Sequence, residues 1–145
     1  ALQTQSYGSE SRGGACKSDV VISDGEILDL APSDTDVLLV MSQPALDKYI
    51  ANLRKNGSLI YDSDLVIPGK ITGKTFGLGA TDIAHKIFGR DVVANVIMIG
   101  YLAGLTKVVT QRSLRRAISE NVPPKTQDIN LKAFDEGYNR GATQM

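Results

Sequence analysis

A strand–helix–strand pattern between residues 36 and 61 constrains the fold more than any other stretch of this sequence. Residues 36–41 form a continuous apolar run of strand length, which is typical of a strand buried on both faces of a parallel sheet. After this run, Ser42 and Gly57 are the cap and stop signals of a predicted helix, and residues 58–61 are predicted to form a second strand. The apolar residues of the helix repeat at helical spacing: Leu46, Tyr49, Ile50 and Leu53. Two parallel strands joined by a helix make a right-handed crossover, so the pattern predicts an α/β fold.

Further elements are predicted on both sides of this unit. Strands are expected at residues 18–23 and 74–80, and residues 1–6 are either an edge strand or a loop. A helix is expected at residues 81–88, capped by Thr81 or Asp82 and ended by Gly89. Two more helices are expected to begin at Thr110 and Thr126. The C-terminal third is therefore predicted to be helical.

The helix expected after Asp91 is apolar on nearly all of its faces, which indicates a buried helix. Its small residues would let neighbouring elements approach closely: Ala94, Gly100, Ala103 and Gly104. The apolar run at residues 92–105 is shorter than the roughly 20 residues that a membrane-spanning helix needs. No membrane span is expected.

Two acidic motifs have more than one interpretation. Asp24-Gly25 suits a tight hairpin turn with residues 26–30 as a return strand, and a plain surface turn fits almost as well. Asp62 and Asp64 follow the strand at residues 58–61. Ligands gather at the carboxyl ends of strands in open α/β sheets, but acids at that position can equally cap loops.

Composition excludes several classes of function. The 145 residues carry no formal net charge, whereas proteins that bind nucleic acid usually have a basic face. The basic cluster Arg112, Arg115 and Arg116 is interpreted as the solvated face of one helix. Cys16 is the one cysteine and His85 the one histidine, so an iron–sulfur cluster or a structural zinc site, each needing about four ligands, is not expected on this chain. We interpret His85 as a packing or surface residue and expect a cytoplasmic protein.

The glycine-rich segment at residues 6–14 is the best candidate for a functional site. It contains glycines, an aromatic residue, an acid and an arginine, a mixture that a packed core does not require. Glycine allows close backbone approach, and arginine suits a phosphate or carboxylate. An ordered loop closing over the sheet is the plainer interpretation. The candidate residues are Ser6, Tyr7, Gly8, Glu10, Arg12, Gly13 and Gly14.

Several blocks of sequence, taken in order, resemble the gamma subunit of 2-oxoacid:ferredoxin (or acceptor) oxidoreductases, and the 2-oxoglutarate branch in particular. The resemblance covers nearly the whole chain, and its specificity comes from the order of the blocks. They are residues 6–14 and 17–23, 36–38 with Ser42, Gln43 and Tyr49, 59–63, 80–84, 95–100 and 130–138.

The resemblance implies a subunit of an enzyme that oxidatively decarboxylates a 2-oxoacid, here 2-oxoglutarate, to an acyl-CoA, here succinyl-CoA. Thiamine diphosphate, Mg²⁺ and iron–sulfur clusters are expected on partner subunits (alpha, beta and a ferredoxin-like delta), with coenzyme A as co-substrate and ferredoxin or a similar acceptor taking the electrons. No cofactor is expected on this chain, which would be a non-catalytic subunit, inactive alone, that supplies subunit docking and part of the coenzyme A site.

The resemblance also implies a three-layer α/β/α fold with a mainly parallel central sheet. Residues 1–145 are expected to form one gamma-type domain that lacks the family's first strand–helix unit. In the segment at residues 6–14, Arg12 would pair with a phosphate or a partner carboxylate, Tyr7 would anchor the interface and Glu10 would hold Arg12. Ser9 stands where the family often has proline, which predicts a less rigid loop.

Other functions stay open at this point. The chain could be the gamma subunit of a pyruvate, 2-oxoisovalerate or indolepyruvate oxidoreductase. It could also be a stand-alone module that binds a small anionic metabolite through the glycine-rich segment and the strand-end acids. A nicotinamide-dependent oxidoreductase is a third candidate, but Gly77-Leu78-Gly79 lacks the third glycine of the dinucleotide-binding motif.

Overall fold

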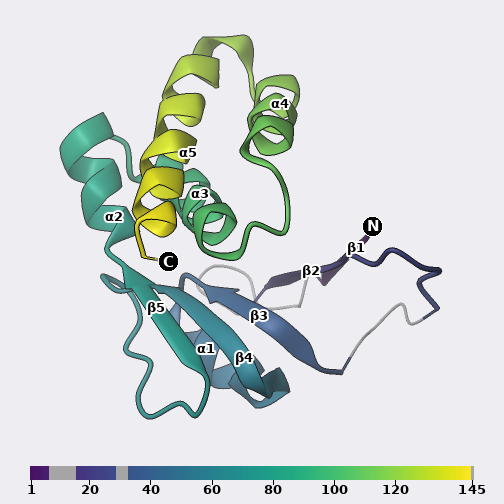
Figure 1. The fold of residues 1–145 in the computed structure, drawn as a ribbon. Helices are drawn as coiled ribbons and strands as arrows, with labels where there is room; N and C mark the ends of the chain where they lie inside the picture. The colour runs from purple at the N-terminus through teal and green to yellow at the C-terminus, as the bar shows by residue number, and fades with distance from the viewer. Residues whose placement is uncertain (7–15, 29–32, 145) are drawn as a thin grey trace.

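The chain folds around a three-stranded parallel sheet with helices on both faces (Figure 1). The structure, a computed structural model, describes residues 1–6, 16–28 and 33–144. Strand β3 is Thr35–Val40, β4 is Leu53–Asp62 and β5 is Lys74–Leu78, with β4 in the middle of the sheet. The predicted three-layer architecture with a parallel sheet and a helical C-terminal third is confirmed.

The crossover from β3 to β4 contains helix α1, Gln43–Tyr49, as predicted. The Ser42 hydroxyl accepts a hydrogen bond from the Ala45 amide at 3.3 Å, and a proline stands in the first turn. The predicted stop at Gly57 is wrong, because the helix passes through a 3₁₀ turn at Ile50–Asn52 and ends before β4 begins. Gly57 instead serves a register shift in β4, where an added Cβ would lie 3.0 Å from the Asp36 carbonyl oxygen.

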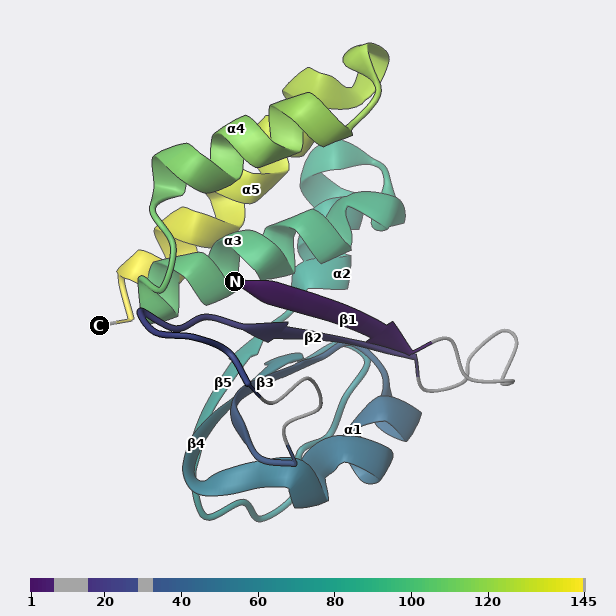
Figure 2. The same cartoon turned by 90° about the vertical axis from the view of Figure 1, so that its right-hand side faces the viewer.

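Apolar side chains alternate between the two faces of β3 and β4, and both faces of the sheet are buried. On one face, Val40 and Leu59 pack with Leu46 of α1. On the other, Leu39 and Ile60 pack against the C-terminal helices. Figure 2 shows α1 on one side of the sheet and α3, α4 and α5 on the other. The continuous apolar runs read from the sequence therefore reflect strands covered on both sides.

The C-terminal half is a layer of helices, and α2 leads into it. Helix α2, Ala80–Ile83, continues as a π-helical turn at Ala84–Phe88 and ends at Gly89, whose φ of 63° lies in the left-handed region. The predicted stop at Gly89 is confirmed. The remaining helices follow as a 3₁₀ turn at Asp91–Val93, α3 at Ala94–Thr106, α4 at Gln111–Asn121, a 3₁₀ turn at Pro124–Thr126 and α5 at Gln127–Ala142.

Helices α3 and α5 cross with their backbones in contact. A Cβ added at Gly100 would overlap the Phe134 carbonyl oxygen, and one at Gly104 would overlap that of Tyr138. In return, Gly137 and Gly141 of α5 lie against carbonyl groups of α3. Each helix thus contributes two glycines four residues apart, and only glycine leaves room for this approach. The predicted close packing at Gly100 and Gly104 is confirmed.

Tyr101 connects this helical layer to the sheet. Its side chain is fully buried, and its hydroxyl donates to the Gly77 carbonyl oxygen of β5 at 3.4 Å. Burial, with a smaller contribution from nearby Tyr61, raises the pKa of the Tyr101 hydroxyl. The phenol is therefore held in its neutral, hydrogen-bonding form.

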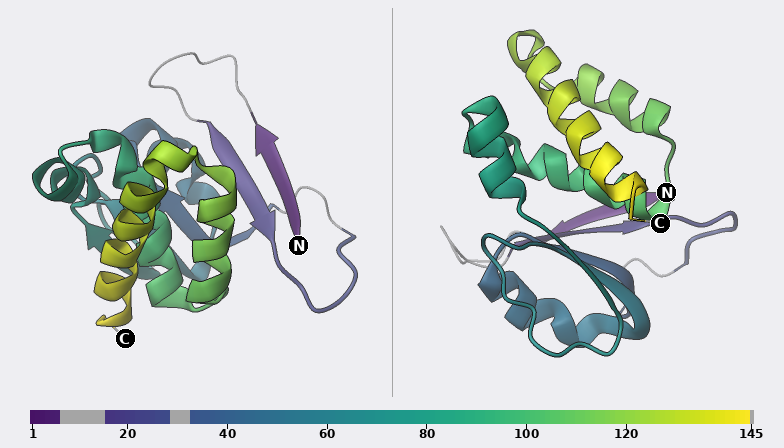
Figure 3. Two further views of the ribbon diagram at one scale, coloured as in Figure 1. Left: turned by 90° about the horizontal axis from the view of Figure 1, so that it is seen from above. Right: turned by 60° about the vertical axis from the view of Figure 1, so that its left-hand side comes forward.

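An antiparallel hairpin, separate from the parallel sheet, precedes these elements. Strand β1, Leu2–Ser6, pairs with β2, Lys17–Val21, and the hairpin projects from one side of the body (Figures 1 and 3). The return strand expected after Asp24-Gly25 is not formed at residues 26–28; residues 29 and 30 lie outside the described part of the chain. Among the described glycines, those with positive φ are Gly69 and Gly89, so Gly25 does not adopt the tight-turn conformation.

Among the described residues, no helix has both the length and the hydropathy needed to cross a bilayer.

Replacing Gly137 by alanine tests the contact between α3 and α5. The added methyl group would meet the Ile97 carbonyl oxygen, which cannot move without separating the helices. We expect G137A to lower the free energy of unfolding by about 1–3 kcal/mol or more, measured by urea denaturation. The control is G25A, because an added Cβ there has no heavy atom closer than 3.9 Å. Equal stability of the two variants would contradict the role of this contact.

Candidate functional site

In the sequence, the candidate segment at residues 6–14 begins at the last residue of β1 and precedes β2. Residues 7–15, which include Tyr7, Gly8, Glu10, Arg12, Gly13 and Gly14, lie outside the described residues. Ser6 is described, and its backbone pairs with Lys17 in the hairpin. The described residues that flank residues 7–15 in the hairpin, Ser6 and Lys17, are therefore held side by side by the β1–β2 ladder. The roles expected for its side chains stay predictions.

The carboxyl end of β4 carries a fully buried acid, Asp62. Its Oδ2 accepts hydrogen bonds from the Thr81 hydroxyl at 2.6 Å and the Thr81 amide at 3.1 Å. Its Oδ1 accepts from the Asp64 amide at 3.0 Å. Both oxygens of this carboxylate are thus occupied by donors from the start of α2 and from the turn after β4, which satisfies a group that is costly to bury unpaired.

Asp64 makes a second link between the same two elements. Its Oδ2 accepts from the Asp82 amide at 2.8 Å, so the first N–H groups of α2 are capped by acids from β4 and its following turn. The expectation that Thr81 or Asp82 caps this helix is wrong, because both residues lie inside α2 and its N-cap is Gly79. Of the two interpretations of the strand-end acids, the structure supports capping.

On the surface of α2, Asp82 pairs with Lys86 at 2.8 Å, one helical turn away. This hydrogen bond and the charge of Asp82 raise the pKa of the exposed Lys86 ammonium. His85 is also exposed, and its Nδ1 lies 3.2 Å from Asp91 Oδ1. The interpretation of His85 as a packing or surface residue is confirmed. The described residues contain no group of three or more His, Cys, Asp or Glu side chains placed to hold a metal ion.

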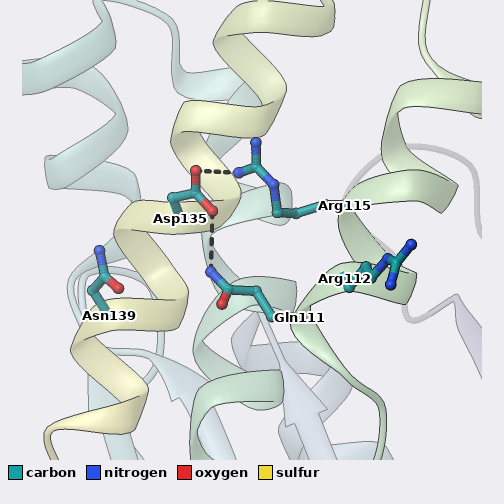
Figure 4. Close-up of a pocket in the computed structure, with 5 residues that line it drawn as sticks. All are labelled: Gln111, Arg112, Arg115, Asp135 and Asn139. Carbon is teal, nitrogen blue, oxygen red and sulfur yellow. Dashed lines mark hydrogen bonds and ion pairs between the residues drawn. The ribbon is translucent and has the colours of Figure 1, made fainter.

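An open polar depression of about 490 Å³ lies between α4 and α5. Figure 4 shows Arg115 and Gln111 of α4 both directed at Asp135 of α5; the Gln111 amide donates at 3.4 Å and Arg115 forms an ion pair. Arg112 also lines the depression but makes no hydrogen bond or ion pair with a described residue. Sequence reasoning did not single out Asp135, because its partner lies on another helix.

The basic cluster has the character of a solvated helix face, as interpreted from the sequence. Arg116 pairs with Glu120 one turn along α4, and Arg112 is exposed. The opposite face of α4 places Leu114 and Ile118 against the core. Arg115 is the exception, since its ion pair with Asp135 joins α4 to α5.

Changing Asp62 to asparagine tests the strand-end network. An amide presents only one acceptor oxygen, so its NH₂ group would face either the Thr81 donors or the Asp64 amide. We expect D62N to lower the free energy of unfolding by roughly 1–3 kcal/mol in chemical denaturation. The exposed Asp24 supplies the control D24N, which should change stability little. A D62N variant as stable as D24N would show that the network contributes nothing.

Comparison with known proteins agrees with this fold. The chain matches the family described as pyruvate ferredoxin/flavodoxin oxidoreductase over residues 1–140. It is 42% identical over 144 residues to 2-oxoglutarate synthase subunit KorC of Methanothermobacter thermautotrophicus, covering 94% of this chain and 76% of that protein. Ketoisovalerate oxidoreductase subunit VorA of the same organism is 33% identical over 135 residues, covering 90% of this chain and 28% of that protein.

A solved structure gives the same result. The gamma subunit of a keto/oxoacid ferredoxin oxidoreductase from Geobacter sulfurreducens superposes with a TM-score of 0.82 at 37% identity, covering 98% of this chain and 80% of that one. The resemblance inferred from the sequence blocks is confirmed. With a family match over residues 1–140 and a 42% identical relative aligned over 94% of the chain, this chain belongs to the pyruvate ferredoxin/flavodoxin oxidoreductase family.

Proposed function

We propose that this chain is the gamma subunit of a 2-oxoglutarate:ferredoxin (or acceptor) oxidoreductase, which converts 2-oxoglutarate and coenzyme A to succinyl-CoA. The observation that carries the proposal is the 42% identity to a 2-oxoglutarate synthase subunit, against 33% to a ketoisovalerate oxidoreductase subunit. The Geobacter sulfurreducens gamma subunit supports the assignment to this kind of subunit.

The chemistry of the reaction belongs on other subunits. With one cysteine and one histidine in 145 residues, the donor set of this chain does not fit an iron–sulfur cluster. Thiamine diphosphate, Mg²⁺ and the iron–sulfur clusters are therefore assigned to alpha, beta and ferredoxin-like delta partners, and ferredoxin or a similar acceptor receives the electrons. The complex is assigned to the cytoplasm.

The contribution of this subunit is placed at the hairpin and the segment at residues 6–14. The outer face of the hairpin exposes Val20 and Ile22, by 61% and 56%, as a surface that meets another subunit would. Arg12 would supply a cation to a coenzyme A phosphate or to a partner carboxylate, with Glu10 orienting it and Tyr7 packing as an anchor.

A stand-alone module for an anionic metabolite is less well supported. That alternative drew on the strand-end acids, and both are engaged in capping α2. The gamma-subunit alternatives for other 2-oxoacids are separated by the substrate experiment that follows.

Reconstitution with the partner subunits tests the substrate. In the presence of coenzyme A, the complex should reduce an artificial electron acceptor rapidly when 2-oxoglutarate is the substrate. The rate should be much lower when the substrate is pyruvate, 2-oxoisovalerate or indolepyruvate. The isolated chain should reduce no acceptor, because one cysteine and one histidine are too few ligands for an iron–sulfur cluster. Preference for another 2-oxoacid would refute the substrate assignment, and turnover by the chain alone would refute its non-catalytic role.

Arg12 can be tested in the same complex. Loss of a charged hydrogen bond weakens binding by about ten- to a hundredfold, so R12A should raise the KM for coenzyme A or the subunit dissociation constant by that factor. The control is R112A, which removes an exposed arginine from α4. If R12A leaves both quantities at the R112A values, Arg12 has no role in either contact.

A further inference from the structure

The loop end of the hairpin, where Lys17 pairs with Ser6, contacts the end of α1. Lys17, the first residue of β2, places its ammonium nitrogen 5.7 Å from the centre of the Tyr49 ring. The same nitrogen lies 2.8 Å from Asp19 Oδ2, which holds the lysine side chain over the inner face of the hairpin. Lys17 and Tyr49 belong to separate blocks of the family resemblance, 32 positions apart in the sequence, and the fold brings them together.

The position of the Tyr49 ring is fixed by the packing of α1 on the sheet. It is the last residue of α1, one turn beyond Leu46, which packs with Val40 and Leu59 on the sheet. The ring is therefore carried by a helix whose own position is set by the buried sheet face. A cation within about 6 Å of such a ring is attracted to it.

The hairpin itself needs such a support. A two-stranded ribbon is at best marginally stable in water, and β1 and β2 are not part of the three-stranded sheet. Its outer face leaves Val20 and Ile22 exposed, while Leu2 and Val21 on the inner face are half-buried. Contacts on the inner side therefore decide where the hairpin sits on the body.

We infer that Lys17 and Tyr49 are positioning residues: their contact fixes the loop end of the hairpin on the three-layer core, in the orientation that the partner subunits and coenzyme A require. The inference rests on the proposed function, since it explains how the hairpin is presented for that contact. Neither residue touches reacting atoms. Lys48 also approaches the Tyr49 ring, at 5.5 Å, but it lies on α1 itself and makes no link to the hairpin.

The experiment compares four single variants in the reconstituted complex and in the isolated subunit. Y49L removes the ring, Y49F keeps it, K17M removes the cation from the hairpin side, and K48M removes the neighbouring cation as a matched control. Hydrogen exchange of the β2 amides, residues 17–21, reports whether the hairpin is held on the core. The KM for coenzyme A, kcat and the subunit dissociation constant report whether its position matters.

We expect the β2 amides to exchange faster in Y49L and K17M than in the wild type. The KM for coenzyme A or the subunit dissociation constant should rise by about two- to fivefold, and kcat should stay unchanged. Y49F, which keeps the ring, should stay closer to the wild type than Y49L, and K48M should match the wild type. If Y49L fails to fold, K17M still tests the contact from the hairpin side.

Two results would overturn the inference. One is β2 exchange in Y49L and K17M that matches the wild type. The other is faster exchange with the KM for coenzyme A and the dissociation constant unchanged. Failure of the proposed function has a different signature: a complex that prefers another substrate, or R12A without effect, while Y49L still changes β2 exchange and assembly.

Discussion

Direct backbone contact between α3 and α5 supports the arrangement of the C-terminal half. Glycines at 100 and 104 on one helix and at 137 and 141 on the other allow each backbone to lie against the carbonyl groups of its neighbour. This approach buries Ile97 and Phe134 completely and brings Tyr101 over the sheet, where its hydroxyl reaches β5. The helical layer is thereby fixed as a unit on one face of the sheet. A larger side chain at any of these glycines would separate the helices and loosen that face.

The carboxyl edge of the sheet has a structural use in this subunit. Ligands of open α/β sheets usually bind at this edge, and Asp62 and Asp64 stand there. Both oxygens of Asp62 and one oxygen of Asp64 instead accept hydrogen bonds, from the Thr81 hydroxyl, from N–H groups at the start of α2 and from the Asp64 amide. Because a buried carboxylate engaged by three donors has little capacity for another partner, the proposed role of the subunit moves away from the edge and to the hairpin.

Sequence patterns predicted strands and helix starts well where the stabilising contacts join residues that are close in the sequence. The strands of the parallel sheet follow from apolar runs, and the helix starts at Ser42 and Thr110 follow from side-chain oxygens that accept from N–H groups in the first turn. Two of the errors concern glycines, because glycine occurs in helix stops, tight turns and strands alike. Gly57 has the sequence context of a helix stop but lies in a strand, at a register shift against Asp36. Gly25 has the context of a tight turn, yet β2 is already paired with β1 and the residues after it form no strand up to residue 28.

The amino-acid sequence was enough to predict the α/β class, the burial of α3 and the family, because strand and helix periodicity and ordered blocks of residues can be read along one chain. It also pointed to residues 6–14 as a candidate site, which stays a prediction. Tertiary structure alone decided that the strand-end acids cap α2, that Asp135 pairs with Arg115, and that Lys17 meets Tyr49. Each of these contacts joins residues from different elements, and their distance depends on how the layers pack, which no local pattern specifies.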